Sequence, residues 1–269
     1  MQVIKLGPAG SPVASTLEGV SKVKELGLQA MEVQFSHGIR MSLILAKQVG
    51  ELAKKEQIEL SVHAPYFINL ASEDREKIGA SKKRILDSCE RAHFFSWSNP
   101  SVVVFHPAYY GKLSKEQTYN QVKEQMEDML DVIKKKKWNV KIAPETTGKH
   151  SAFGNIDEII SVAKELRCGL CVDLPHIYAR NNGKINYEEV LDKLKALHRK
   201  RIHFHFSGIK YSDKGELKHL VMNSNPPFET FAKELLRRNM DSTIISESPI
   251  TWQDSLKMKE IFGKLGYRW

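Results

Sequence analysis

The segment Gly169-Leu-Cys-Val-Asp-Leu-Pro-His176 is a short apolar run that leads into two side chains able to bind metals, Asp173 and His176. Short runs of this kind, rich in β-branched residues, predict buried strands. The same arrangement recurs along the chain, where similar runs lead into His63, His106, Glu145, His205 and Glu247. Parallel strands that end in residues of one chemical kind predict that their carboxyl ends meet at one site.

The whole chain alternates between such runs and amphipathic stretches with helical spacing, several of them opened by a capping residue such as Ser15, Ser114 or Asn155. The expected strands are Val3–Leu6, Ala30–Phe35, Leu60–His63, Val102–His106, Val140–Pro144, Gly169–Asp173, Ile202–Phe206 and Thr243–Ser246. This alternation, without a linker, predicts a closed (β/α)8 TIM barrel with the metal site at the C-terminal face of its strands. An open doubly wound sheet would instead gather its ligands at one switch point between two strands.

Length and composition agree with one intracellular barrel. The chain has 269 residues and a barrel needs roughly 250, so we expect a single TIM-barrel domain spanning residues 1–269. There is no signal-peptide pattern and no apolar run long enough to span a membrane. We therefore expect a cytoplasmic, monomeric protein without a membrane partner. Cys168 and Cys171 should point to opposite sides of one strand, which predicts buried thiols rather than a redox or metal pair.

The candidate ligands are imidazoles and carboxylates without thiolates, which suits zinc, manganese or iron(II) and is typical of catalytic rather than structural zinc sites. Glu145 and Glu247 each offer two oxygens and can bridge neighbouring ions. One histidine at a strand end is more often structural, but that explanation becomes improbable for the whole set. His203, one layer deeper than His205, is expected to be a core residue or to support a ligand. Four further histidines lie outside the pattern and are expected to be structural or on the surface: His37, His93, His150 and His198.

The net charge of +9 favours an anionic partner, above all nucleic acid. Lys134–Lys137 and Arg199–Arg201 precede strands, so they should lie on the opposite, amino-terminal face as solvated helix ends. Basic residues that follow strands should lie beside the site and give it a positive face: Arg40, Lys112, Lys149, Arg180, Lys210, Lys214 and Lys218. Of these, we expect Arg40, Lys149, Arg180 and Lys210 to contact DNA phosphates.

These motifs resemble the endonuclease IV family of apurinic/apyrimidinic endonucleases, within the xylose isomerase-like barrels. The resemblance runs through His63-Ala-Pro-Tyr66-Phe-Ile-Asn69, Phe105-His106-Pro107, Glu145-Thr-Thr-Gly148, Asp173-Leu-Pro-His176, His205 and Glu247. It implies a DNA-repair hydrolase that cleaves the phosphodiester 5′ to an abasic site in double-stranded DNA and leaves a 3′-hydroxyl. Glu145 would be its catalytic residue, and Tyr66 would help to hold the distorted DNA.

The resemblance also implies two or three Zn²⁺ ions. His63 and His106 would hold the first ion and Glu145 would bridge it to a second, whose site is completed by Asp173, His205 and Glu247. His176 and His219 would belong to the third ion.

The chain departs from the family at two places. Leu217 stands where the family has an aspartate ligand of the third ion, so Glu216 and Asp213 are the candidate substitutes. We expect the third ion to be weakly bound, or to be Mn²⁺ rather than Zn²⁺. The loop after the second strand also differs, and Arg40 and Phe35 are the candidates for the side chain that enters the DNA.

Two other functions compete with this prediction. A metal-dependent sugar isomerase or epimerase on the same barrel would use Glu145, Asp173, His205 and Glu247 but would not need the histidines after the third and fourth strands. A non-catalytic DNA-binding barrel would have no use for so many convergent ionisable groups. His63, His106 and His219, together with the positive charge, favour the nuclease.

Overall fold

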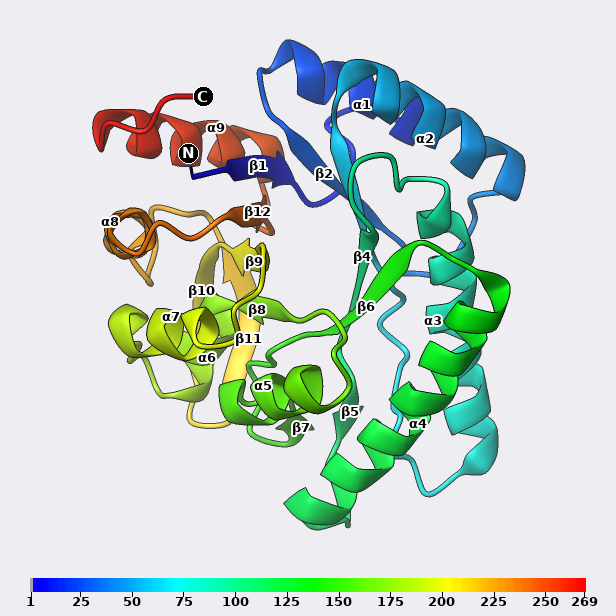
Figure 1. Ribbon diagram of the computed structural model, residues 1–269. Helices are drawn as coiled ribbons and strands as arrows, with labels where there is room; N and C mark the ends of the chain where they lie inside the picture. The colour runs from blue at the N-terminus through cyan, green and yellow to red at the C-terminus, as the bar shows by residue number, and fades with distance from the viewer. Residues whose placement is uncertain (1) are drawn as a thin grey trace.

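The computed structural model describes residues 2–269 and has eight parallel strands arranged as a ring (Figure 1). The barrel strands are β1 (Ile4–Pro8), β2 (Ala30–Gln34), β3 (Glu59–His63), β4 (Ser101–Phe105), β6 (Val140–Pro144), β8 (Cys171–Asp173), β9 (Ile202–Phe206) and β12 (Ser242–Ser246). They form two four-stranded sheets, β2-β3-β4-β6 and β1-β12-β9-β8. The predicted (β/α)8 barrel is confirmed, with every expected strand present and its ends shifted by two residues at most.

The two sheets meet at two seams, which close the ring. The backbone of Ala9, directly after β1, bridges to Glu32 of β2, and the backbone of Glu145, directly after β6, bridges to Cys171 of β8. Gly7 allows the close approach at the first seam, because a Cβ atom there would lie 1.8 Å from the carbonyl oxygen of Ala30. Strand pairing at the seams is therefore sparser than within each sheet.

Helices surround the ring (Figure 1). They are α1 (Thr16–Glu25), α2 (Leu43–Glu56), α3 (Arg75–His93), α4 (Lys115–Lys136), α5 (Ile156–Glu165), α6 (Leu174–Arg180), α7 (Tyr187–Lys195), α8 (Phe228–Arg237) and α9 (Thr251–Lys264). The predicted caps Ser15, Ser114 and Asn155 all accept hydrogen bonds from the first turn of their helices. No helix within residues 2–269 is long and apolar enough to cross a membrane.

The core has an outer and an inner part. A large apolar cluster, to which Leu6, Val62 and Phe204 belong, includes residues from both the strands and the helices. A small separate cluster of Val104, Ala143 and Cys171 includes residues of three adjacent barrel strands. Cys168 lies before β8 rather than on the same strand as Cys171 and packs in the outer cluster, and both thiols are buried and unpaired, as predicted. The carboxyl half of the barrel interior is left to polar side chains.

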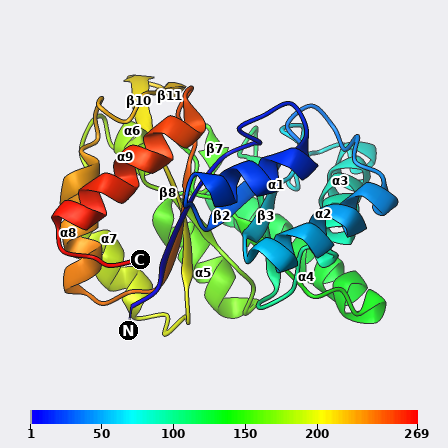
Figure 2. The same ribbon diagram turned by 90° about the horizontal axis from the view of Figure 1, so that it is seen from above.

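Two antiparallel pairs lie among the loops that follow the strands. β5 (Ala108–Tyr109) pairs with β7 (Ala152–Phe153), and β10 (Gly208–Ser212) forms a hairpin with β11 (Gly215–Leu220) between β9 and α8. Figure 2 shows this hairpin at the end of the molecule opposite to the N-terminus. A strict alternation of strand and helix did not predict either pair, and both contribute to the walls of the site.

Candidate metal centre

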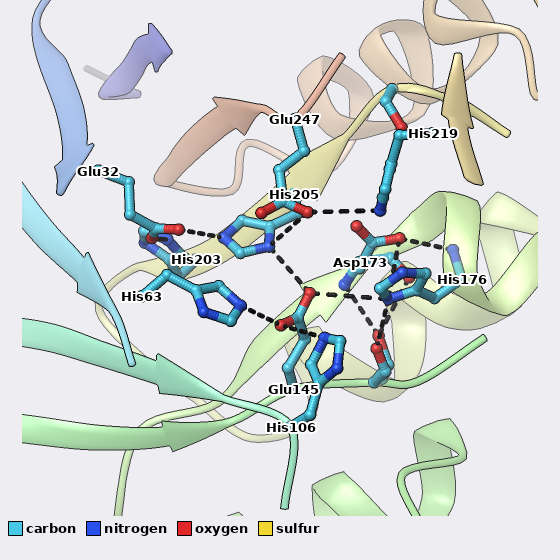
Figure 3. Close-up of polar contacts among 12 residues, drawn as sticks. Glu32, His63, His106, Glu145, Asp173, His176, His203, His205, His219 and Glu247 are labelled. Atoms are coloured by element: carbon cyan, nitrogen blue, oxygen red, sulfur yellow. Dashed lines mark hydrogen bonds and ion pairs between the residues drawn. The ribbon is translucent and has the colours of Figure 1, made fainter. Parts of the chain in front are cut away.

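The barrel brings the predicted ligands together because each stands at or next to the carboxyl end of a strand (Figure 3). His63 and Asp173 are the last residues of β3 and β8, and His205 is the penultimate residue of β9. Three others directly follow β4, β6 and β12: His106, Glu145 and Glu247. Asp173 also caps α6, where its Oδ1 accepts a hydrogen bond from the backbone N–H of His176 at 2.5 Å. His219 reaches the same place from β11.

The ligand atoms gather into three groups at this end of the barrel. The first group is His63, His106 and Glu145; the second is Glu145, Asp173, His205 and Glu247; the third is Asp173, His176 and His219. Within each group all ligand atoms lie within 4.8 Å of one another. Because Glu145 belongs to two groups and Asp173 to two, the groups are adjacent and could hold neighbouring ions.

Glu145 lies at the centre of the contacts. Its Oε2 is 3.2 Å from Nε2 of His63 and 3.1 Å from Nε2 of His106, while its Oε1 is 2.9 Å from Nδ1 of His205. Nδ1 of His63 lies 2.8 Å from the carbonyl oxygen of Ala64, which can only accept, so this nitrogen carries the proton. That tautomer leaves Nε2 of His63 facing Glu145, as a ligand nitrogen should.

The charges of the site depend on one another. Burial alone would raise the pKa of Glu145, but the positive charges of His205 and His106 hold it well below its usual range. Burial alone would likewise lower the pKa of His63, but Glu145 outweighs it and raises this pKa to about 9. Burial raises the pKa of Asp173 well above its usual range, and the charges of Glu145 and Glu247 add to the effect. A cation at this position would compensate the buried carboxylates.

Two buried atoms support a metal ligand role independently. Oδ2 of Asp173 and Nε2 of His176 have no aligned hydrogen bond, although Nε2 has a carboxylate oxygen of Glu216 within 3.2 Å, and buried polar atoms without a hydrogen bond are rare in folded proteins. Nδ1 of His176 lies 2.9 Å from the carbonyl oxygen of Thr146, which leaves Nε2 as the nitrogen available to a ligand. Imidazole nitrogens and carboxylate oxygens are the donors that catalytic zinc and manganese accept. The residues present therefore fit a cluster of divalent cations.

A β-bulge brings Glu216 to the third group. The hairpin pairs Tyr211 with Glu216 but Lys210 with Lys218, so Leu217 is an extra residue in β11. The bulge puts Glu216 on the same face as His219, although the two are three positions apart and a regular strand would place them on opposite faces. Oε2 of Glu216 lies 3.2 Å from Nε2 of His176, whereas Leu217 is 57% exposed.

The other predicted substitute, Asp213, is exposed in the hairpin turn and belongs to none of the ligand groups. Gly148 provides the room for Glu216, since a Cβ atom there would lie 2.5 Å from Cβ of Glu216. Burial alone would raise the pKa of Glu216, but the charge of His176 outweighs it and lowers this pKa below its usual range. Glu216 is therefore an anionic carboxylate beside the third group.

The ligand groups open into a pocket of about 470 Å³ at the carboxyl end of the barrel. His63, His106, Glu216, His219 and Glu247 line it from within. Tyr66, Tyr109 and Lys149 also line it, and Tyr66 is 52% exposed. The pocket is open to solvent and carries aromatic and basic groups at its mouth.

The other basic residues predicted to contact DNA have different surroundings. Arg40 and Lys210 are exposed on segments that follow β2 and β9. Arg180 is not a free cation, because its guanidinium donates hydrogen bonds to the carbonyl oxygens of Thr147, Lys149 and Ala152. It holds the loop after β6 in place. Phe35 is 4% exposed, so its prediction as a side chain that enters DNA is wrong: it packs in the core.

The strand pattern gave no reason to single out Glu32, in the middle of β2. It is fully buried inside the barrel, where it contacts His203 and His205 (Figure 3). The available signal was one carboxylate between the apolar residues Met31 and Val33 of a strand. His203 lies beneath the ligands, as predicted.

Comparisons with known proteins agree with this architecture. A family model described as "Xylose isomerase-like TIM barrel" matches residues 20–261. An uncharacterized protein from Methanocaldococcus jannaschii is 36% identical over 270 residues, covering 96% of this chain and 97% of that protein. A probable endonuclease 4 from Aquifex aeolicus is 25% identical over 199 residues, covering 68% of this chain and 67% of that protein.

Three further matches, an apurinic-apyrimidinic endonuclease from Caenorhabditis elegans and probable endonucleases 4 from two Mesomycoplasma hyopneumoniae strains, align with about half of this chain and with less than half of their own lengths. Among solved structures, a D-tagatose 3-epimerase-like protein superimposes with a TM-score of 0.72 at 21% identity, covering 98% of this chain and 96% of that chain. This likeness concerns the fold.

Proposed function

Since the chain belongs to the xylose isomerase-like TIM barrel family, we propose that it is a metal-dependent DNA-repair endonuclease, which hydrolyses the phosphodiester 5′ to an abasic site and leaves a 3′-hydroxyl. The relatives named as endonucleases support the nuclease, and the epimerase-like solved structure represents its rival. The proposed partner is double-stranded DNA with an abasic site.

The adjacent ligand groups carry the proposal. Glu145, Asp173, His205 and Glu247 would suffice for one ion, as in a sugar epimerase, but His63, His106, His176 and His219 extend the donor set on both sides. Neighbouring divalent cations, when bound, neutralise charge on a phosphate and on the oxygens that attack and leave it. The donor set of this chain is therefore larger than an epimerase needs and suits phosphodiester hydrolysis.

The chain's own residues have distinct roles in this proposal. Glu145 orients the attacking water and accepts its proton, because its two oxygens face the first and the second ligand group. Glu216 completes the third group in place of an aspartate at position 217. Lys149, Lys210 and Arg40 contact the DNA backbone, and Tyr66 contacts the nucleotides at the lesion.

The surface around the pocket favours a large ligand over a free sugar. Most of the exposed large apolar side chains of residues 2–269 belong to segments that follow barrel strands: Val13, Leu43, Ile44, Tyr66, Phe67, Tyr109, Leu217 and Val221. A monosaccharide within the pocket would contact only the two rim side chains that also line it, Tyr66 and Tyr109. Exposed aromatic side chains can stack on nucleic acid bases, and an abasic nucleotide is readily extruded because it has no base to unstack.

An incision assay tests the proposal. The substrate is an end-labelled duplex with one tetrahydrofuran abasic analogue, incubated with the protein before and after treatment with a chelator. We expect one cut 5′ to the analogue, a product that a polymerase can extend, loss of cutting with the chelator and recovery with Zn²⁺ or Mn²⁺.

Glu145→Gln, purified in parallel, controls for contaminating nucleases and should be inactive. Ketohexoses such as D-tagatose are assayed beside the DNA with the same two proteins. Sugar epimerisation that requires Glu145, without incision of the duplex, would overturn the nuclease in favour of the epimerase.

A further inference from the structure

A second layer of polar side chains lies inside the barrel, on the side of the ligand groups nearer the amino ends of the strands. The proposed hydrolysis does not require these side chains. We call Glu32, Ser61, Cys171 and His203 the lower layer; all four are buried. Glu32 is its only carboxylate and has no exposed surface. A carboxylate at such depth is costly unless several groups donate to it, so its partners indicate its role.

Donors from two sheets hold the Glu32 carboxylate. Ser61 Oγ on β3 donates a hydrogen bond to Oε2 at 2.8 Å, and Gln34 Nε2 on β2 donates to Oε1 at 3.1 Å. His203 Nε2 on β9 lies 2.9 Å from Oε2. β2 and β3 belong to one four-stranded sheet and β9 to the other, so Glu32 reaches across the barrel interior.

The fourth contact of Glu32 is with a ligand. Its Oε1 lies 3.0 Å from Nε2 of His205, close but not aligned as a hydrogen bond, so the contact is electrostatic. The other ring nitrogen, Nδ1, lies 2.9 Å from Oε1 of Glu145 and 3.4 Å from Oε2 of Glu247. The imidazole of His205 therefore stands between Glu32 on one side and Glu145 and Glu247 of the second ligand group on the other (Figure 3).

We propose that Glu32 is a positioning residue, which with Ser61 and His203 holds His205 so that its Nδ1 faces the second ligand group. A negative carboxylate beside the far nitrogen of a metal-binding histidine favours the proton on that nitrogen and makes the imidazole a better ligand. Cys171, His203 and His205 also form a compact group, but Nε2 of both histidines already faces Glu32, which favours positioning over another metal. The inference rests on the proposed metal centre and not on DNA as substrate.

The test compares Glu32→Gln with the wild type and with Glu59→Gln. Glutamine keeps the volume of the side chain and removes its charge. Glu59 is a matched control, because it is a partly buried glutamate on the adjacent strand whose partners are Lys5 and Arg201 at the amino end of the barrel. Metal content after dialysis and competition with a chromogenic chelator for Zn²⁺ give the number and affinity of the ions.

We expect Glu32→Gln to bind one ion about 10- to 100-fold more weakly and to keep the others. Glu59→Gln should keep the wild-type affinity for every ion even if it melts at a lower temperature. A folded Glu32→Gln protein, judged by circular dichroism, with wild-type affinity for every ion would overturn the inference.

If Glu32→Gln does not fold, Ser61→Ala takes its place, because it removes one donor and leaves the carboxylate. A several-fold weaker affinity for one ion supports the inference, and an unchanged affinity overturns it. These measurements are independent of incision. A wild-type protein that binds its metals but does not cut DNA would contradict the proposed function and leave the role of Glu32 standing.

Discussion

Single residues show how one charge type takes different roles in this chain. Lys149 is exposed at the mouth of the pocket, whereas the guanidinium of Arg180 donates hydrogen bonds to carbonyl oxygens of the neighbouring loop. The side chains of Lys134–Lys137 belong to the far end of the barrel, ahead of β6. A positive net charge alone could not distinguish these cases, because the difference depends on where each side chain points.

The exposed cations at the carboxyl end lead to a prediction about salt. Replacing Arg40, Lys149 or Lys210 singly by alanine should remove up to one phosphate contact in each variant. Each lost contact should reduce the slope of log affinity against log salt concentration by about 0.9. Fluorescence anisotropy with labelled abasic duplex at several salt concentrations measures the slope. Lys135→Ala is the control and should leave it unchanged. Equal effects from Lys135 and Lys149 would mean that DNA binding is diffuse and not centred on the pocket.

Glu59 gives a prediction about pH at the opposite end of the barrel. Its oxygens lie 2.7 Å from Nζ of Lys5 and 2.5 Å from Nη1 of Arg201. Burial alone would raise the pKa of Glu59, but Lys5 and Arg201 outweigh it and lower this pKa. The stabilisation is therefore present above the unfolded pKa of about 4.3 and is lost as the pH falls through the lower folded value.

Glu59→Gln should thus lower the free energy of unfolding by about 1–3 kcal/mol at pH 7. Urea denaturation of both proteins from pH 7 to pH 3 measures the difference, which should shrink below pH 4. A constant difference over that range would show that the charge of Glu59 is not the cause.

At the scale of elements, the β-bulge in β11 decides which carboxylate joins the third ligand group. Glu216→Gln should lower the affinity for one ion. The loss should exceed the roughly 10- to 100-fold that follows removal of a group that only hydrogen-bonds to a ligand. Metal analysis after dialysis measures the loss. Asp213→Asn, in the exposed turn of the same hairpin, is the matched control and should retain all ions.

A second variant tests the register of the hairpin itself. Leu217→Asp added to Glu216→Gln should not restore the lost ion, because position 217 faces solvent. Recovery of the ion in this double variant would show that β11 pairs without the bulge.

The sequence predicted the strands and most ligands because both follow from local patterns. An apolar run predicts a buried strand, and His63, His106 and Glu145 stand where such runs end. The position of Glu216 depends on an extra residue in a hairpin, which no apolar pattern marks. The contact between Glu32 and His205 joins β2 to β9, so it exists only once the ring has closed.

At the scale of the whole molecule, the metal centre joins the two sheets of the barrel. His63, His106 and Glu145 come from or follow strands of one sheet, while Asp173, His205 and Glu247 come from or follow strands of the other. Ions bound among them would connect halves that share few strand hydrogen bonds. Ligand binding of this kind stabilises the folded state over the unfolded one.

The two seams of the barrel give that connection a dynamic consequence. The backbones of Glu32 and Glu145 take part in the bridges that close the two seams, and their side chains lie on either side of His205. His205 therefore connects the two seams. Local opening of either seam should disturb the contacts of His205 with these glutamates, and binding of Zn²⁺ should make opening of both seams rarer. In hydrogen–deuterium exchange, we expect slower exchange at the amides of Gly10 and Thr146, which donate across the two seams to the carbonyl oxygens of Glu32 and Cys171. Glu32→Gln removes the charged contact on one side of His205, so Zn²⁺ should still slow exchange at Thr146 but no longer at Gly10. Equal slowing at both amides in this variant would show that the seams open independently of the metal centre between them.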